Sequence, residues 1–301
     1  MTNEGRLALK SDDVRAALAD ALRGKASRLA ELLARHGGLP GRANMALAAA
    51  FGDAVAGEGN AARAVLAALA REQAEADTAR AFLPIAAAFG YAARLKSDPR
   101  DAWDGVRELA ADDRAPVRIG LTDALHAFSA RAAGNVDLLV AHAAEWLELD
   151  DRDHVYASQA IALDVVAASR GLQGLEDPSA LLEWLGRVLD HVANAPRADE
   201  RSPARRKLLS ALPGALAETA SSLREGIPWL TERIADAPHP DLRAMFERTI
   251  DELRRGSRAQ SAPTLEALRS ALTSTKKPPR DPSRIREGTT GRGKKARRRS
   301  R

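Results

Sequence analysis

Apolar residues follow the period of an α-helix along most of the chain. In one segment they recur at i, i+4, i+7, i+8 and i+11, one face of a helix with about 3.6 residues per turn: Val117, Leu121, Ala124, Leu125 and Phe128. The segment from 181 to 192 has the same kind of spacing. Alternation typical of strands is confined to short pieces such as 164–166. The pattern predicts an all-α protein without a β-sheet.

Glycine and proline clusters divide this helical pattern into short segments. Because short connections between short helices place neighbours antiparallel, we expect helical pairs and roughly twelve to thirteen helices. The last helix is predicted over Pro263 to Leu272, as a terminal cap. The breakers are Gly37–Gly41, Gly57–Asn60, Asp98–Pro99, Gly134–Asn135, Gly171–Pro178, Pro196 and Pro238–Pro240.

A helical half-motif recurs at a fixed spacing. Residues Arg42–Gly52 read RANMALAAAFG, and residues Arg80–Gly90, which begin 38 positions later, read RAFLPIAAAFG. The next unit begins another 38 positions on with Arg118, and its Phe128 comes one place late. A period of roughly 20–50 residues indicates a solenoid, in which each unit packs on its neighbours.

We call the first residue of each unit (Arg42, Arg80 and Arg118) its register position. Positions at the same spacing continue beyond the third unit with one interruption. Tyr156 follows Arg118 after 38 residues, Arg205 follows after a longer gap of 49, and Arg243 comes another 38 residues on. The longer gap contains residues 195–201, which we interpret as a surface insertion.

Acidic residues precede the register position in several units. In three of them the acid stands six positions before a residue at or next to the register position: Asp112 before Arg118, Asp150 before Tyr156 and Glu200 before Arg206. An Arg in the first turn of a helix, such as Arg118, faces an unfavourable helix dipole and needs a nearby anion. We expect the Asp and Arg side chains of neighbouring units to form a ladder that fixes the angle between units.

Two stretches carry a resemblance to a known family. Residues 112–125 read DDRAPVRIGLTDAL and residues 239–253 read HPDLRAMFERTIDEL, which resemble the Asp, Pro, Val-Arg and Ala-Leu pattern of HEAT-like helical repeats. The resemblance covers about residues 10–255, although Tyr156 replaces the Arg in one unit and the first two units lack the Asp. It implies a right-handed α-solenoid of HEAT-like hairpins over residues 1–273, whose surface displays a binding site for a macromolecule.

Composition narrows the chemistry and the compartment. The chain has no cysteine, which excludes disulfides, thiolate metal sites and Cys nucleophiles and agrees with a reducing compartment. The first ten residues lack an apolar core, and no stretch approaches the roughly 20 apolar residues of a membrane helix. We therefore expect a soluble, cytoplasmic protein.

Charge is divided unevenly between the body and the C-terminus. The segment from 275 onward carries a net charge of +10, which leaves −5 on the rest of the chain. From 274 onward Lys, Arg, Pro, Gly, Ser and Thr prevail, and residues 274–301 are predicted to be a disordered basic tail because they bury too little apolar surface to offset the entropy of ordering. Such a tail is expected to attract nucleic acid or another polyanion. Its basic residues are Lys276, Lys277, Arg280, Arg284, Arg286, Arg292, Lys294, Lys295, Arg297, Arg298, Arg299 and Arg301.

The body contains one dense basic cluster and one acidic patch. Arg201, Arg205, Arg206 and Lys207 begin a predicted helix, and two interpretations stay open: phosphate contacts beside a groove, or a solvated face with one ladder Arg. The acidic residues, which could hold the protein's own tail, are Glu145, Glu148, Asp150, Asp151 and Asp153.

Three patterns associated with other chemistries are incomplete. Residues 288–295 read GTTGRGKK, but Lys295 stands where a phosphate-binding loop needs Ser or Thr, and no strand precedes the segment. The six histidines form no close ligand pair, so we expect no metal and no cofactor. HEAT-like DNA glycosylases for alkylated bases carry a Trp-Asp-x-Val-Asp segment, whereas the similar segment at Trp103 ends in Arg107, which lacks the catalytic carboxylate.

The four tryptophans have two possible roles. They fall at helical spacing and are interpreted as packing residues, although a Trp on a groove can also stack on a base. They are Trp103, Trp146, Trp184 and Trp229. The sequence thus favours a non-enzymatic scaffold that binds a protein on its surface and DNA or RNA through its tail. A repair glycosylase and a purely protein–protein adaptor are the alternatives.

Overall fold

The computed structural model describes residues 11–38, 42–237, 239–256 and 259–274. Within these ranges the chain is all-α, with fifteen α-helices, two short 3₁₀-helices and no strand, which confirms the predicted fold class. The number of helices is higher than expected because short helices such as α10 (Ser169–Gln173) carry too few residues to show a period. The other α-helices are α1 (Ser11–Leu22), α2 (Ala26–His36), α3 (Met45–Val55), α4 (Ala61–Ala70), α5 (Phe82–Arg94), α6 (Pro99–Ala110), α7 (Ala115–Arg131), α8 (Asn135–Trp146), α9 (Arg152–Ala167), α11 (Pro178–Ala193), α12 (Pro203–Ser222), α13 (Gly226–Ala235), α14 (Pro240–Arg255) and α15 (Ala262–Ser274).

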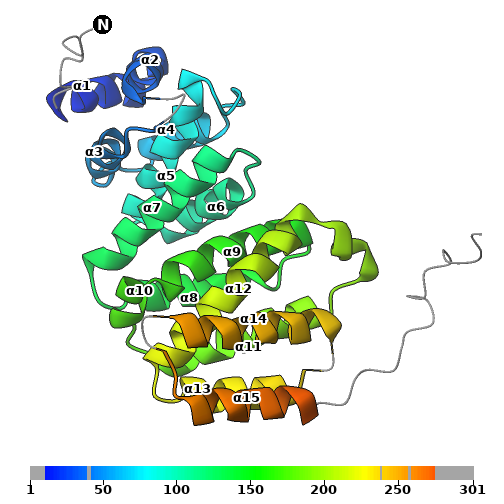
Figure 1. The fold of residues 1–301 in the computed structure, drawn as a ribbon. Helices are drawn as coiled ribbons and strands as arrows, with labels where there is room; N and C mark the ends of the chain where they lie inside the picture. The colour runs from blue at the N-terminus through cyan, green and yellow to red at the C-terminus, as the bar shows by residue number, and fades with distance from the viewer. Residues whose placement is uncertain (1–10, 39–41, 238, 257–258, 275–301) are drawn as a thin grey trace, which may run out of the picture.

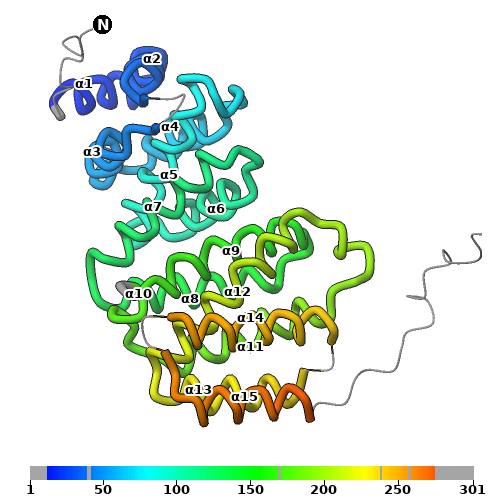
Figure 2. Tube along the Cα trace, viewed as in Figure 1, coloured from blue at the N-terminus to red at the C-terminus, as the bar shows by residue number. Residues whose placement is uncertain are grey.

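The helices form two rows that follow the order of the chain (Figure 1). In one row α3 packs on α5, α5 on α7, α9 on α12 and α12 on α14, while in the other α8 packs on α11, α11 on α13 and α13 on α15. The trace in Figure 2 shows the rows running from α1 at one end of the molecule to α15 at the other. The contact between α7 and α9 is much narrower than those on either side of it, between α5 and α7 and between α9 and α12.

The repeated half-motif lies where α3 and α5 meet. Phe51 and Phe89 are both buried. A Cβ atom placed on Gly52 would lie 2.8 Å from the carbonyl oxygen of Phe89, so the two helices approach closely enough to require glycine there. Gly120 on α7, at a different position relative to the motif, also lies close to a neighbouring helix, since its Cβ would lie 2.6 Å from Ile85 of α5. Glycines therefore allow close contacts between α3 and α5 and between α5 and α7.

The predicted insertion packs back on the body. It contains the 3₁₀-helix η2 (Arg197–Arg201), and its Asp199 accepts a hydrogen bond of 2.7 Å from the hydroxyl group of Tyr156. Tyr156 is fully buried, whereas the Arg118 side chain of the corresponding position is only half-buried. The register position thus holds Tyr156 rather than Arg in the unit where the inserted segment, through Asp199, covers this side chain.

Ion pairs join helices that are distant in the sequence, and one of them uses the register residue Arg205, whereas the register residue Arg118 makes no such pair with a described residue. Arg205 pairs with Asp241 at 2.8 Å, 36 positions later, and a similar pair joins α4 to the start of α6. The Asp112 carboxylate instead pairs with Arg114 at 2.6 Å, and Arg118 donates to the Asp112 carbonyl oxygen. The predicted pairing of the early acid with the register Arg is therefore wrong in this unit, because Arg114 is nearer to the carboxylate.

Candidate functional site

A groove opens where the row of helices is least tightly packed. It lies between the N-terminal halves of α7, α9 and α12 and has a volume of about 600 Å³. Ala115, Ala157, Ile161 and Ala204 form much of its apolar lining. The narrow contact between α7 and α9 accounts for its position, because small side chains at this junction leave space that larger ones would fill.

Ile119 gives the groove an accessible apolar anchor point. This side chain lines the groove and is 57% exposed, which makes it one of two large apolar residues exposed in the described part of the chain. The other is Leu138 on α8, at 37%. Ile119 lies on the opposite side of α7 from Val117 and Leu121, which are fully buried. An isolated exposed Leu or Ile is ordinary on a protein surface, but an exposed Ile inside a concave groove indicates a binding surface.

Aspartates surround this apolar surface. Asp113, Asp123, Asp153 and Asp164 line the groove together with the paired Asp112, against the two cations Arg118 and Lys207. Among the described residues, no Lys, Arg or His nitrogen lies within 4.0 Å of the carboxylate oxygens of Asp113, Asp123 or Asp164, so these three form no ion pair. The groove therefore combines an apolar floor with an excess of negative charge.

The charged side chains of the groove are partly withdrawn from water. Burial by surrounding atoms raises the pKa of Asp164 above its usual value, against the opposing effect of nearby His126, although the side chain still reaches solvent. Burial also lowers the pKa of Lys207, and the positive charge of Arg118 adds to that effect while Asp113 opposes it. The raised pKa of Asp164 means that a cationic group beside this carboxyl would relieve an existing electrostatic cost, whereas the lowered pKa of Lys207 means that the same cationic group would be unfavourable next to Lys207.

Hydrogen bonds hold the walls of the groove in place. Arg114, which precedes α7, donates to the carbonyl oxygens of Glu72 at 2.7 Å and Ala74 at 2.9 Å and so ties this wall to an earlier loop. On the opposite side, the Ser202 hydroxyl donates to Asp153 at 2.5 Å and accepts from the Arg205 amide at 3.2 Å. Ser202 therefore caps α12 and links it to α9 at the same time.

The predicted basic cluster does not form a single surface. Arg205 is only 3% exposed, pairs with Asp241 and donates to the Val192 carbonyl oxygen at 3.5 Å, so it is not placed to contact a phosphate. Arg201 and Arg206 are exposed, whereas Lys207 faces the acidic groove. The cluster divides because residues at successive positions of one helix point in different directions. The other predicted nucleic-acid-binding residues, at 276–301, and the glycine-rich segment 288–295 lie outside the described residues.

Three residues of the predicted acidic patch have partners within the chain, of which one is an arginine and two are histidines. Glu145 contacts His142 at 2.9 Å, Asp151 contacts His154 at 2.7 Å, and Glu148 pairs with Arg187. Of the patch residues, Asp153 lines the groove. The acidic lining of the groove thus shares only Asp153 with the predicted patch, and its other aspartates lie on or before α7 and further along α9.

The tryptophans serve mainly as core residues. Trp103, Trp146 and Trp184 are buried, and Trp229 is half-buried. Trp103 stacks on His142 with ring centroids 4.3 Å apart. Arg107 contacts Asp104 at 3.5 Å. No Trp of the described residues is therefore exposed beside a carboxylate on a groove, the arrangement expected for a pocket that holds a flipped base.

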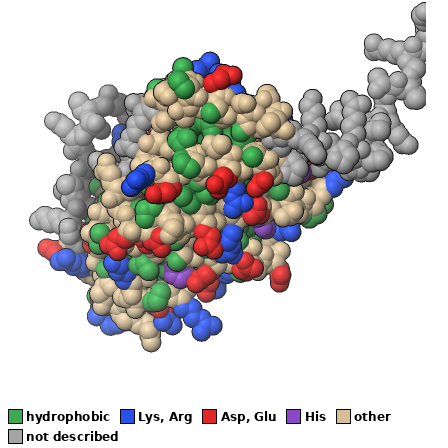
Figure 3. Space-filling model, turned by 90° about the horizontal axis from the view of Figure 1, so that it is seen from below, with side chains coloured by type: hydrophobic (Ala, Val, Ile, Leu, Met, Phe, Trp, Pro, Cys, Tyr) green, Lys and Arg blue, Asp and Glu red, His purple; other side chains and the backbone are tan. Residues whose placement is uncertain are grey.

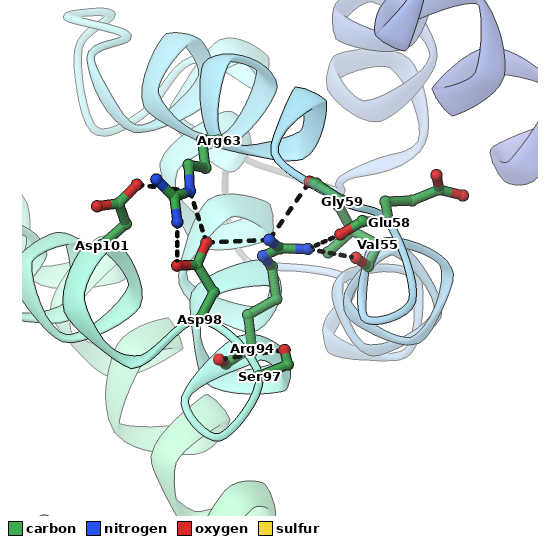
Figure 4. A network of polar contacts seen from close by, with 8 residues as sticks. All are labelled: Val55, Glu58, Gly59, Arg63, Arg94, Ser97, Asp98 and Asp101. Carbon is green, nitrogen blue, oxygen red and sulfur yellow. Dashed lines mark hydrogen bonds and ion pairs between the residues drawn. The ribbon is translucent and has the colours of Figure 1, made fainter.

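A second polar cluster near α4 and α6 is of a different kind (Figure 4). Arg63 binds Asp98 through two hydrogen bonds of 2.6 and 2.8 Å, and Arg94 donates to the same carboxylate at 3.0 Å. Arg94 also donates to backbone carbonyl oxygens, including that of Val55 at 3.3 Å. These hydrogen bonds satisfy the charges internally, so this network fastens three helical units together and leaves little for a ligand.

Comparisons with known proteins and searches for metal-binding and membrane-spanning features identify no other candidate site in the described residues. Comparison of the chain with protein-family models, curated proteins and solved structures finds nothing that matches it. Over the described ranges, no group of three His, Asp or Glu side chains is arranged to hold a metal ion. No described helix is both long enough and apolar enough to cross a lipid bilayer. The groove is therefore the candidate site on which we build.

Proposed function

We propose that this chain is a non-enzymatic scaffold, a right-handed α-solenoid of HEAT-like hairpins over residues 1–273. It binds a segment of another protein in the groove between α7, α9 and α12, and its basic arm, residues 274–301, attracts nucleic acid without sequence preference. The 38-residue period and the two rows of helices support the repeat architecture.

The single observation that carries the proposal is the composition of the groove. Exposed Ile119 lies among carboxylates, of which Asp123 and Asp164 have no ion-pair partner within the described ranges. Phosphates would be repelled from such a surface, whereas a peptide with an apolar residue flanked by basic residues would match it in both respects. The groove therefore favours a protein ligand, and the arm is the part of the chain suited to a polyanion.

Peptide selection on the immobilised protein tests the groove. We expect enriched peptides to carry one large apolar residue between Lys or Arg residues. Ile119→Glu should abolish their binding, and Leu138→Glu, which changes the other exposed apolar residue, should leave it intact. Equal loss in both variants, or none in either, would contradict the assignment of the groove.

A salt series tests the arm. Truncation after Ser274 removes a net charge of +10, and each phosphate that the shortened chain no longer neutralises should reduce the slope of log affinity against log salt by about 0.9 on duplex DNA. Equal affinity and slope for the full and shortened chains in anisotropy titrations would rule out the arm as the nucleic-acid-binding segment. If peptides still bound the groove, the protein would then be a protein–protein adaptor.

A further inference from the structure

We propose that the first occupant of the groove is the chain's own C-terminal arm, through Arg284, Ile285 and Arg286. Ile285 would lie on the apolar floor beside Ile119, and the two arginines would approach the aspartates of the walls. This rests on the proposed use of the groove for a protein segment. It adds that the chain's own arm competes with the partner protein for the groove.

The sequence of the arm provides a single matching segment. Apart from proline, Ile285 and Ala296 are the only apolar residues after Ser274, and Ile285 is the larger. It stands directly between Arg284 and Arg286. In an extended segment neighbouring side chains point to opposite faces, so one apolar residue can face a groove floor while its neighbours reach toward the walls.

The charges of groove and arm are complementary. The groove presents Asp123 and Asp164 without ion-pair partners in the described chain, and residues 275–301 carry a net charge of +10. Both acidic and basic side chains lie on the face at the C-terminal end of the molecule (Figure 3), whereas the groove has five aspartates against the two cations Arg118 and Lys207.

The tether has a suitable length and starting point. The arm begins at the end of α15, on the side of the molecule where α12 begins (Figure 1). From α15 the path to the groove crosses α14 and α12, and with neighbouring helices about 8–10 Å apart it measures about 30 Å. The residues from Ser274 to Ile285 span up to about 36 Å when extended. Ile285 can therefore reach the groove, with little chain to spare.

Attachment to the same chain makes a weak contact sufficient. A tether that must be nearly extended holds its end at a lower effective concentration than the millimolar value of a slack one, but docking remains intramolecular and does not depend on protein concentration. A nucleic acid would compete with the groove for Arg284 and Arg286, because each guanidinium group can pair either with the groove aspartates or with a phosphate. Binding of a polyanion to the arm is thus expected to clear the groove for a protein partner.

Site-specific photo-crosslinking in the full-length chain tests the proposal. The photoreactive residue p-benzoylphenylalanine replaces Ile285, and the matched control carries it at Ala296. We expect position 285 to give at least fivefold more crosslinks within one chain, mapping to α7, α9 and α12, at a yield that does not depend on protein concentration. Asp164→Lys in the same chain should reduce this yield at least fivefold, while Asp236→Lys, at an exposed Asp beyond α13, should not.

Each other outcome overturns the proposal. Equal yields at 285 and 296, crosslinks to other helices, crosslinks between two chains, or indifference to Asp164→Lys all contradict docking in the groove. If Asp164→Lys fails to fold, the comparison of positions 285 and 296 in the otherwise unchanged chain still decides. Duplex DNA binding by the same chains separates the two ideas: intramolecular crosslinking without DNA binding supports the docking and refutes the nucleic-acid role of the arm.

Discussion

Removal of the Asp98 carboxylate should be among the most damaging single changes to this fold. Asp98 is 8% exposed and accepts hydrogen bonds from both Arg63 and Arg94. Arg94 is itself only 4% exposed, so Asp98→Asn would leave a buried guanidinium beside a neutral amide. Breaking a buried ion pair in this way costs about 3 kcal/mol, which corresponds to a fall of roughly 6–12 °C in the melting temperature.

The chain provides a matched control for this change. Asp101 lies 2.8 Å from the same Arg63, but its side chain is 39% exposed. Asp101→Asn should therefore cost less than about 1 kcal/mol, because solvent screens an exposed pair. Thermal and urea unfolding followed by circular dichroism would measure both. Equal losses in the two variants would refute the reasoning that burial, rather than contact with Arg63, sets the importance of Asp98.

The acid response gives an independent measure of the same network. Hydrogen bonding from Arg63, and then from Arg94, lowers the pKa of Asp98 below its usual value. A carboxyl group with a lowered pKa in the folded state stabilises the protein above its unfolded pKa of about 3.9, and this stability is lost as the pH falls through the lower folded value. We expect Asp98→Asn to be less stable than the wild-type at pH 6 and to lose less further stability below pH 4. Parallel stability curves for the two proteins would contradict this assignment.

Two further expectations concern the α3–α5 contact and the tyrosines. Gly52→Ala places a Cβ 2.8 Å from the Phe89 carbonyl oxygen and should destabilise the protein by about 1–2 kcal/mol in urea unfolding, whereas Gly57→Ala, with open space around it, should change stability by less than about 0.5 kcal/mol. Burial raises the pKa of Tyr91 to about 12, and burial with the Asp199 hydrogen bond also raises the pKa of Tyr156. Since these are the only two tyrosines, absorbance at alkaline pH should show no ionisation near pH 10 until the protein unfolds. A midpoint near 10 in the folded protein would show that both rings are accessible.

Periodicity revealed the fold class because it depends on local rules. The stripe from Val117 to Phe128 is buried on α7, and the predicted terminal helix corresponds to α15. The repeated Phe-Gly pair identified a contact between units, although only the structure shows that Gly52 is needed for a close approach to Phe89. Spacing alone could not reveal which Arg meets which Asp, because a side chain several bonds long can choose among several nearby partners.

The groove was harder to find in the sequence. Ile119 offered one signal, since it is an apolar residue on the polar side of an otherwise regular stripe. Asp113 lies in the loop before α7, Asp123 on α7 and Asp164 on α9, and the spacing between α7 and α9, a property of the packing, brings them to one groove. The basic run that includes Arg205 allowed two interpretations, because the sequence does not show which of its residues faces a neighbouring helix; the structure places Arg205 against Asp241 of α14 and buries it.

The narrow junction between α7 and α9 also determines where the helices should separate most easily. In the proposed solenoid, stability is a sum over neighbouring units, so the narrow α7–α9 contact is expected to separate at a lower cost than the α5–α7 and α9–α12 contacts. We expect the helices up to α7 and those from α9 onward to move relative to one another at this junction. A ligand that contacts both walls of the groove would then reduce this motion, so that binding in the groove would make the helices on both sides of the junction move as one body.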